Sequence, residues 1–263
     1  MSQIDRAFGR RAFGADAPNY DRARPPYPAW VFDQLRETCG VGAGAAVLEI
    51  GAGTGAATRR LLGLEPGRLV AVEPDARLAE FLRQATPSAA LELRLEAFED
   101  VDLSENAFDL AAAFTSFHWL DESAALAKIS RLLRRGGWWA ACWNVFGDDA
   151  YPDPFHEATR SVLSGPLSPS AGTGGVPFAL DAAARIAAIA SSGAFARPLY
   201  WTAHWPLELT TDETVALYAT YSNVEALPDR QAVLAELRRI ADETFGGRVI
   251  RNMTTVLYLA QRT

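Results

Sequence analysis

Three glycines and one glutamate have the spacing that a nucleoside-binding site needs. Gly51, Gly53 and Gly55 follow a short apolar run in the stretch AAVLEIGAGTG. Glycine at this point allows a tight turn and lets backbone N–H groups approach a ligand. Glu73 ends the next apolar run, 22 residues after Gly51, where a carboxylate can accept both hydroxyls of a ribose. The spacing therefore indicates a nucleoside site.

A second carboxylate narrows the choice of nucleoside. GAGTGA also satisfies the G-x-G-x-x-A dinucleotide pattern, so the loop alone does not decide. Glu49 lies two residues before Gly51, and a carboxylate there suits an ammonium group better than a pyrophosphate. The stretch RLEAFEDVDL falls where an adenine would lie, and the C-terminal strands give no second mononucleotide half. These features favour S-adenosylmethionine over NAD. A glycine turn needed only for packing would leave the position of Glu73 unexplained.

A histidine and several aromatic side chains fall where further strands are predicted to end. His118 and Trp119 follow the run FDLAAAFTSF, Trp143 and Asn144 end the run WWAACWNV, and His156 begins the next helix. Ligands of open parallel sheets bind outside the carboxyl ends of the strands. We therefore expect these residues at the wall of an acceptor site.

The role of His118 has two interpretations. It is a general base or acceptor-orienting group, helped by a pKa near neutrality, or it fixes the loop by hydrogen bonds while Trp119 packs against the cofactor. A sulfonium is already a strong electrophile, so alignment supplies much of the catalysis, and only an acceptor that carries a proton needs a base. His118 and Tyr20 are the candidates for a catalytic role.

A proline-rich segment near the N-terminus is predicted to form a flap over the cofactor. Tyr20, Arg24 and Tyr27 belong to it, and Tyr27 is assigned to the acceptor pocket. Arg24 can pair with the cofactor carboxylate or with an acidic acceptor. The alternative is a surface segment shaped by its prolines.

Three aspartates after the fifth predicted strand are candidate ligands for a metal ion. Asp148, Asp149 and Asp153 are interleaved with Pro and Gly, and no matching acid except Asp121 follows the fourth strand. A solvated loop is the better interpretation, so no metal ion is predicted.

Strands that alternate with helices are predicted to position these residues. Apolar runs predict strands over 46–50, 68–74, 90–98, 108–117 and 138–145, and helices over 56–64, 75–85 and 121–137. Asp75 is expected to cap the helix over 75–85 and Asp121 the helix over 121–137, which Gly136 and Gly137 are expected to end. Alternation of this kind predicts a parallel sheet covered on both faces.

The second half of the chain is predicted to be more irregular. Patterns indicate helices over 154–163 and 180–193, strands over 197–209 and 254–262, and two helices within 211–245. The fold class is α/β, a Rossmann-like doubly wound seven-stranded sheet, mostly parallel with an antiparallel C-terminal strand, plus a helical lid. The expected units are a flap and helix (1–40), a cofactor-binding core (41–145), a lid helix and mobile loop (146–180), and the remaining sheet with a helical insertion (181–263).

Composition excludes several kinds of partner. The 263 residues carry a net charge of -7, which disfavours a nucleic-acid phosphate track. Cys39 and Cys142 form no disulfide framework or metal-ligand spacing. The N-terminal stretch lacks a signal-peptide core, and no run of about 18 apolar residues occurs. We expect a cytoplasmic protein without a membrane or nucleic-acid partner, as a monomer or homodimer.

Several motifs resemble the class I S-adenosylmethionine-dependent methyltransferases. The resemblance is to the small-molecule branch (methyltransferase type 11) with trans-aconitate-like and ubiquinone-biosynthesis-like enzymes, and it covers most of the chain. It rests on YDRARPPYP (20–28), VLEIGAGTG (47–55), VAVEPDARLAEFLR (70–83), NAFDLAAAFTSFHWLD (106–121), LLRRGGWWAACWN (132–144), TYSNVEALPDR (220–230) and TVLYLA (255–260).

The resemblance implies a cofactor site and a reaction class. It assigns the methionine moiety, ribose, adenine and sulfonium to Glu49, Gly51, Ala52, Gly53, Thr54, Gly55, Glu73, Pro74, Leu78, Ala97, Phe98, Glu99 and Thr115. Many relatives carry Asp at the position of Ala97, which cannot accept from the adenine amino group as Asp does. The implied activity is methylation of a small-molecule acceptor on O or N, in a setting such as secondary metabolism, with S-adenosylhomocysteine as product. The alternatives are a member of the fold that binds the cofactor without methyl transfer, and an NAD-dependent oxidoreductase.

Overall fold

A seven-stranded sheet forms the centre of the computed structural model, which describes residues 4, 5, 8, 12–172 and 174–263. The strand order is β3-β2-β1-β4-β5-β7-β6. The strands are β1 (Ala46–Ile50), β2 (Arg68–Val72), β3 (Leu91–Arg94), β4 (Phe108–Phe114), β5 (Leu133–Val145), β6 (Leu199–Thr210) and β7 (Arg248–Gln261). The predicted doubly wound, Rossmann-like sheet is confirmed.

The strand directions also agree with the prediction. β1 lies parallel to β2 and β4, β2 to β3, and β4 to β5. β7 runs antiparallel to both β5 and β6. The final two strands therefore pair at one edge of the sheet, with the helical insertion between them in sequence.

The two faces of the sheet are covered by different helices. Leu48 and Val70 pack on one face with α6 (Glu122–Leu132) and α8 (Ala182–Ser191). Their neighbours Val47 and Leu69 pack on the other face with α3 (Ala29–Glu37) and α4 (Ala56–Leu62), and α5 (Ala76–Ala85) packs on β2 through Leu82 and Ala71. Since β1 is buried at every residue, a continuous apolar run is what its sequence needs.

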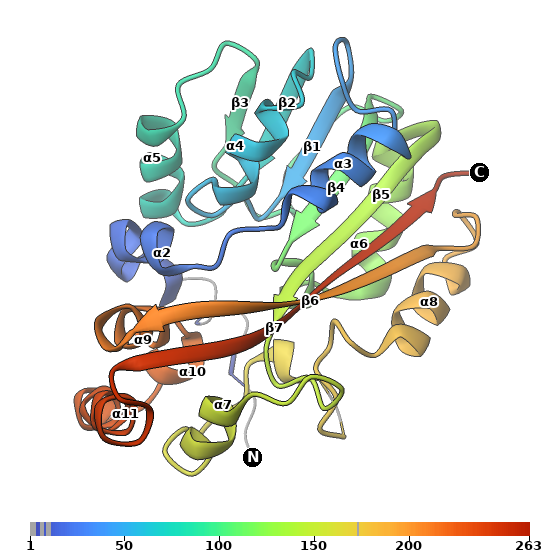
Figure 1. Ribbon diagram of the computed structural model, residues 1–263. Coiled ribbons are helices and arrows are strands. Elements are labelled where there is room, and N and C mark those ends of the chain that lie inside the picture. The colour runs from blue at the N-terminus through green and yellow to red at the C-terminus, as the bar shows by residue number, and fades with distance from the viewer. Residues whose placement is uncertain (1–3, 6–7, 9–11, 173) are drawn as a thin grey trace.

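The last two strands carry a helical group at one end. Figure 1 shows α9 (Thr211–Tyr218), α10 (Ser222–Glu225) and α11 (Arg230–Phe245) gathered at the ends of β6 and β7 that lie away from the C-terminus. α2 (Ala17–Ala23) lies between this group and α5 (Figure 1) and contacts both. The N-terminal segment thus connects the sheet's first half to the helical insertion.

Two helix caps are confirmed and one predicted helix end is wrong. The side chains of Asp75 and Asp121 accept hydrogen bonds from the first turns of α5 and α6. α6 ends at Leu132, and β5 begins at the next residue, so Gly136 and Gly137 lie in a strand. A Cβ on Gly137 would lie 2.9 Å from the Arg134 carbonyl oxygen, so this glycine allows close backbone contact and does not end a helix.

Other element boundaries differ from the prediction in length. β3 stops at Arg94, because the chain turns at Ala97, whose carbonyl accepts from Asp100 N and Val101 N. β7 begins six residues before the predicted start and extends to meet the whole of β6. The predicted helix 154–163 is a short α7 (Pro154–Thr159). The helical insertion contains three helices instead of the two predicted.

Parts of two predicted units fall outside the residues that the structure describes. The flap and helix (1–40) contain η1 (Phe13–Asp16), α2 and α3, while residues 1–3, 6–7 and 9–11 lie outside the described residues. The predicted lid segment (146–180) contains α7 and η3 (Pro169–Ala171), and residue 173 is likewise outside. Among the described residues, no helix is long and apolar enough to cross a membrane.

Candidate functional site

One cavity of about 710 Å³ opens at the carboxyl ends of the central strands. Of the site residues predicted from sequence, it is lined by Tyr20, Tyr27, Glu49, Gly51, Ala52, Gly53, Thr54, Glu73, Pro74, Leu78, Phe98, Glu99, Thr115, His118, Trp119, Trp143, Asn144 and His156. The fold therefore brings together segments that are spread along the chain from Tyr20 to His156 in α7.

Two predicted site residues lie outside the wall of this cavity. Gly55 is the N-cap of α4 with φ 90°, and a Cβ there would lie 2.3 Å from Leu82 Cδ1. Ala97 forms the turn after β3, where its carbonyl accepts two backbone hydrogen bonds. Gly55 thus allows α4 and α5 to approach each other, and Ala97 contributes backbone.

The glycine loop is held by the end of β2. The backbone N–H groups of Gly51 and Ala52 both donate to the Val72 carbonyl, at 2.8 and 3.1 Å. Gly51 and Gly53 have φ values of 71° and 59°, which favour glycine. A Cβ on Gly51 would lie 2.6 Å from Ser116 Cβ, whereas a Cβ on Gly53 would meet nothing within 4 Å. Gly51 therefore permits packing on the loop after β4, and Gly53 borders open space.

Two buried carboxylates lie at the ends of β1 and β2. Glu73 Oε2 accepts from Gly53 N at 2.8 Å and Oε1 from Asp75 N at 2.9 Å. Glu49 Oε2 accepts from the Thr58 hydroxyl at 2.6 Å. Burial, with a smaller contribution from Glu73, raises the pKa of Glu49 to about 8. Glu49 is therefore mostly protonated at pH 7, and a cation beside it would restore its negative charge.

The loop after β4 is joined to the flap by a hydrogen bond. Thr115 has φ 53°, and its N–H donates to the Cys142 carbonyl at 2.7 Å. The Tyr27 hydroxyl donates to Thr115 Oγ1 at 2.8 Å. Burial raises the pKa of Tyr27 well above its usual value, so the phenol keeps its proton.

His118 lies in η2 (Phe117–Trp119), directly after β4, and is 5% exposed. Trp143 Nε1 donates to its Nδ1 at 3.1 Å. Burial, assisted by the charge of Arg24, lowers the pKa of His118 to about 3. Because an indole nitrogen only donates, Nδ1 carries a lone pair, and the neutral ring has its proton on Nε2.

Asn144 also lines the cavity, but its amide is used within the fold. Its Nδ2 donates to the carbonyls of Pro25 and Pro26 at 3.2 Å each. Its Oδ1 accepts from the Thr255 hydroxyl at 2.7 Å. Asn144 therefore joins the flap to β5 and β7.

Arg24 lies between two aromatic rings. Its guanidinium carbon is 4.6 Å from the centre of the Tyr20 ring and 4.9 Å from that of Tyr221. One terminal nitrogen donates to the Thr220 carbonyl at 2.8 Å. Arg24 makes no ion pair with a described residue, and residues 1–3, 6–7, 9–11 and 173 include no Asp or Glu. The cavity wall thus contains a cation without a counter-ion.

Sequence reasoning missed further cavity residues: Phe13, Phe146, Arg160 and Phe178. Phe13 packs on Tyr20 and Trp119, and Phe178 packs on His118 and Trp143. Phe178 lies in a Pro- and Gly-rich stretch without periodicity, so no sequence pattern marked it.

The prediction of a solvated loop holds for Asp149, which is exposed, but is wrong for Asp148 and Asp153. Asp153 is fully buried, and its Oδ2 accepts from Arg251 Nε at 2.6 Å. Asp148 Oδ2 accepts from the Thr254 hydroxyl at 2.7 Å and lies 3.3 Å from His204 Nε2. These carboxylates join the loop to β6 and β7. Within the described part of the chain, no three His, Cys, Asp or Glu side chains gather as a metal site would require.

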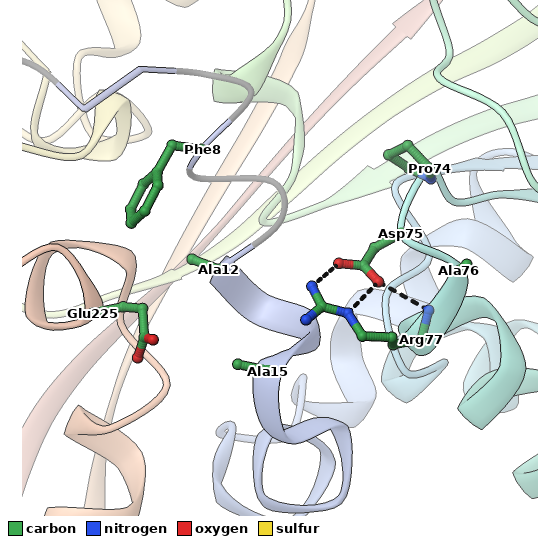
Figure 2. Close-up of a pocket in the computed structure, with 8 residues that line it drawn as sticks. All are labelled: Phe8, Ala12, Ala15, Pro74, Asp75, Ala76, Arg77 and Glu225. Atoms are coloured by element: carbon green, nitrogen blue, oxygen red, sulfur yellow. Dashed lines mark hydrogen bonds and ion pairs between the residues drawn. The ribbon is translucent and has the colours of Figure 1, made fainter.

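A second pocket borders the end of β2. Figure 2 shows Phe8 and Glu225 on one side of this pocket and, on the other side, the start of α5, where Arg77 pairs with Asp75. Pro74 lines both this pocket and the main cavity. The N-terminal segment therefore lies beside the main cavity.

The Rossmann-like sheet and the glycine loop beside the cavity place this protein in the α/β class. A family model described as a methyltransferase domain matches residues 48–141. An uncharacterized methyltransferase of Geobacillus kaustophilus is 32% identical over 157 residues, which are 56% of this chain and 68% of that protein. The chain belongs to the class I S-adenosylmethionine-dependent methyltransferases.

A second curated relative is matched over less of its length. An uncharacterized methyltransferase of Schizosaccharomyces pombe is 30% identical over 160 residues, 60% of this chain and 62% of that protein. The chain thus spans about three-fifths of that curated relative. Phosphoethanolamine N-methyltransferase 2 of Haemonchus contortus, solved with phosphomonomethylethanolamine and S-adenosylhomocysteine, is 12% identical with a TM-score of 0.59, over 98% of this chain and 60% of that chain. It shares the fold.

Proposed function

We propose that this protein transfers a methyl group from S-adenosylmethionine to a small-molecule acceptor. The observation that carries the proposal is the pair of buried carboxylates, Glu49 and Glu73, at the ends of β1 and β2 beside the glycine loop. Glu73 is a buried carboxylate that lines the cavity directly after β2 and suits ribose hydroxyls. Glu49 suits the cofactor's ammonium group. An acid at the position of Glu73 also fits a dinucleotide, but a carboxyl at Glu49 would lie beside a pyrophosphate, which argues against NAD.

The adenine is assigned to the side of the cavity toward β3. Pro74, Leu78 and Phe98 supply apolar surface there, and Glu99 lines the same side. Thr115 is assigned to the neighbourhood of the sulfonium. When bound, the cofactor supplies an electrophilic methyl group.

The remaining wall is assigned to the acceptor. Trp119, Trp143 and Phe178 give it an aromatic surface, and His118 and Arg24 add hydrogen-bond donors. The chain's contribution is to hold the acceptor in line with the methyl group and to exclude water, which can supply several kcal/mol of the barrier.

Thermal unfolding with added ligands tests the cofactor, and product formation tests the transfer. We expect S-adenosylhomocysteine to raise the Tm at concentrations well above its Kd, and NAD to leave it unchanged. Methyl transfer is then measured as S-adenosylhomocysteine formed with a broad acceptor panel. Stabilisation by NAD alone would contradict the proposal. Tight cofactor binding without any product would indicate a member of the fold that does not transfer methyl groups.

A further inference from the structure

An irregular segment before α8 forms part of the wall of the main cavity. It runs from Leu163 to Phe178, and η3 is the only helix among its described residues. Phe178 ends the segment, and its N–H donates to the Ser170 carbonyl at 3.0 Å. The centre of its ring lies 6.2 Å from that of the His118 ring and 5.8 Å from that of Trp143. The position of this one ring therefore shapes the wall beside His118 and Trp143.

The Phe178 ring is stacked on a cation that lies outside the cavity. The guanidinium carbon of Arg185, in α8, is 3.5 Å from the centre of the ring. The Arg185 side chain is 13% exposed and does not line the cavity. Its Nε and Nη1 are buried without a hydrogen-bond partner among the described residues. Because a cation–π contact is strongest when the cation is desolvated, Arg185 is well placed to hold the ring.

Arg185 also reaches the start of α6. Its Nη2 lies 3.2 Å from Oε2 of Glu122, the first residue of that helix. Burial raises the pKa of Glu122, and the charge of Arg185 opposes this rise. α8 contacts α6 (Figure 1), and α6 begins shortly after the turn that carries His118. Arg185 therefore connects two segments of the cavity wall, the one that ends at Phe178 and the one that follows β4.

A neighbouring hydrogen bond holds the backbone but not the ring. The Tyr258 hydroxyl donates to the carbonyl of Ala179, the residue after Phe178, at 2.6 Å. Asp181 caps α8 by accepting from Ala184 N. These bonds fix where the segment joins α8. The direction of the Phe178 side chain depends on what its ring contacts, and Arg185 is the charged group in contact with it.

We propose, on the basis of the methyltransferase function above, that Arg185 is a positioning residue for methyl transfer. Paired with Glu122, it holds the Phe178 ring in the cavity wall. Through that ring it fixes the His118 and Trp143 side chains beside the acceptor, without touching the acceptor itself. Alignment dominates this kind of transfer, and a misplacement of about 1 Å can lower the rate about 100-fold. The carboxylates proposed for the cofactor follow β1 and β2, so cofactor binding does not depend on Arg185.

The first test needs no ligand and records the Trp143 indole N–H in ¹H–¹⁵N spectra, assigned by its loss in Trp143→Phe. The Phe178 ring contributes to its chemical shift, so Arg185→Met should move the signal from the wild-type position toward that of Phe178→Leu. In the Phe178→Leu background, Arg185→Met should add nothing. Arg83→Met removes an exposed arginine paired with Glu80 and should leave the signal in place.

The comparison separates positioning from a loss of stability, because lower stability alone does not move the chemical shift of a protein that stays folded. An unchanged signal in Arg185→Met would overturn the proposal. An equal further shift in the Phe178→Leu background would also overturn it, since Arg185 would then act by another route than the ring.

The second test separates alignment from cofactor binding. Arg185→Met should retain S-adenosylhomocysteine affinity within about twofold by calorimetry. Turnover is measured with S-adenosylmethionine and benzoate, phenol, aniline or thiophenol, one aromatic compound for each kind of acceptor group. For a compound that wild type methylates, Arg185→Met should lower kcat about tenfold or more. Arg185→Lys, which keeps a cation beside Phe178 and Glu122, should restore part of it, and Arg83→Met should match wild type.

Two outcomes of the second test would overturn the proposal. They are a wild-type kcat in Arg185→Met and a parallel loss of S-adenosylhomocysteine affinity. If wild type forms no product with any of the four compounds, that result counts against the proposed function, whereas the shift comparison still decides whether Arg185 holds the ring.

Discussion

Glu73 Oε2 accepts a hydrogen bond from Gly53 N at 2.8 Å, so the carboxylate after β2 is tied directly to the glycine loop after β1. Its other oxygen holds the Asp75 N–H, at the N-cap of α5. The loop, the strand end and the helix start are thus fixed together. This gives the cavity a preformed shape, which favours binding because less ordering is needed.

Two glycine substitutions should separate binding from folding. Gly53→Ala places a methyl group in open space at φ 59°, so we expect a loss of about 1–2 kcal/mol in unfolding free energy and much weaker S-adenosylhomocysteine binding. Gly55→Ala drives a Cβ into Leu82, so we expect a loss of about 2–5 kcal/mol. Gly44 also has a positive φ, and a Cβ there would meet no atom within 4 Å. Because Gly44 does not line the cavity, Gly44→Ala should leave binding unchanged. Chemical denaturation and calorimetry measure both effects; normal binding by Gly53→Ala would contradict the assignment.

Binding should release a proton from Glu49. At pH 7 its carboxyl is mostly protonated, because burial raises its pKa to about 8. The ligand's ammonium group would lower that pKa and ionise the carboxyl. Calorimetry of S-adenosylhomocysteine in buffers of different ionisation enthalpy should show release of a fraction of one proton up to one proton at pH 7, and none from this group in Glu49→Gln. Equal proton release by the two proteins would rule out this pairing.

The same carboxyl should make stability depend on pH. A folded-state pKa above the unfolded value means that the folded form binds the proton more tightly, so stability is lost as pH rises from about 4.5 through about 8. Glu49→Gln keeps the neutral form at all pH values. We expect it to be similar to wild type at pH 5 and more stable by on the order of a few kcal/mol at pH 9. Urea unfolding at the two pH values checks this, and no pH-dependent difference would count against it.

The buried pair of Asp153 and Arg251 should be essential for folding. Both side chains are fully buried, and the terminal nitrogens of Arg251 have no hydrogen-bond partner among the described residues. Asp153→Ala leaves that cation uncompensated, so we expect a loss of about 3–5 kcal/mol. The exposed pair of Arg248 and Glu208 offers a control, since Glu208→Ala should have little effect. Similar unfolding midpoints for the two variants would show that the buried charge matters less than its environment implies.

Much of the sheet could be predicted because burial leaves a direct pattern in sequence. β1 and β2 are apolar runs ended by Gly51 and Glu73, and the caps Asp75 and Asp121 mark helix starts by local hydrogen bonding. These signals depend on neighbours along the chain. The side of the cavity that we propose for the cofactor is built from such segments, so most of the residues that line it could be named from the sequence.

The side of the cavity that we propose for the acceptor depends on contacts between distant segments. Arg251 and Asp153 are 98 residues apart, and neither periodicity nor spacing pairs them. Phe178 reaches His118 from an irregular stretch. The Trp143–His118 bond joins the ends of β4 and β5, and only the folded geometry reveals which imidazole nitrogen carries the proton. The helix end predicted at Gly136 and Gly137 was wrong for a related reason. In sequence, a glycine needed for close backbone contact looks the same as a glycine that ends a helix.

Calorimetric titration of S-adenosylhomocysteine into wild type, Glu73→Ala and Glu37→Ala tests the central claim most directly. Glu37 is an exposed carboxylate at the end of α3 that does not line the cavity. We predict tight one-to-one binding to wild type and Glu37→Ala, and binding about tenfold or more weaker to Glu73→Ala, because ribose hydroxyls lose a charged acceptor. Equal affinity for all three proteins, or no binding to wild type, would contradict the assignment of this cavity to S-adenosylmethionine.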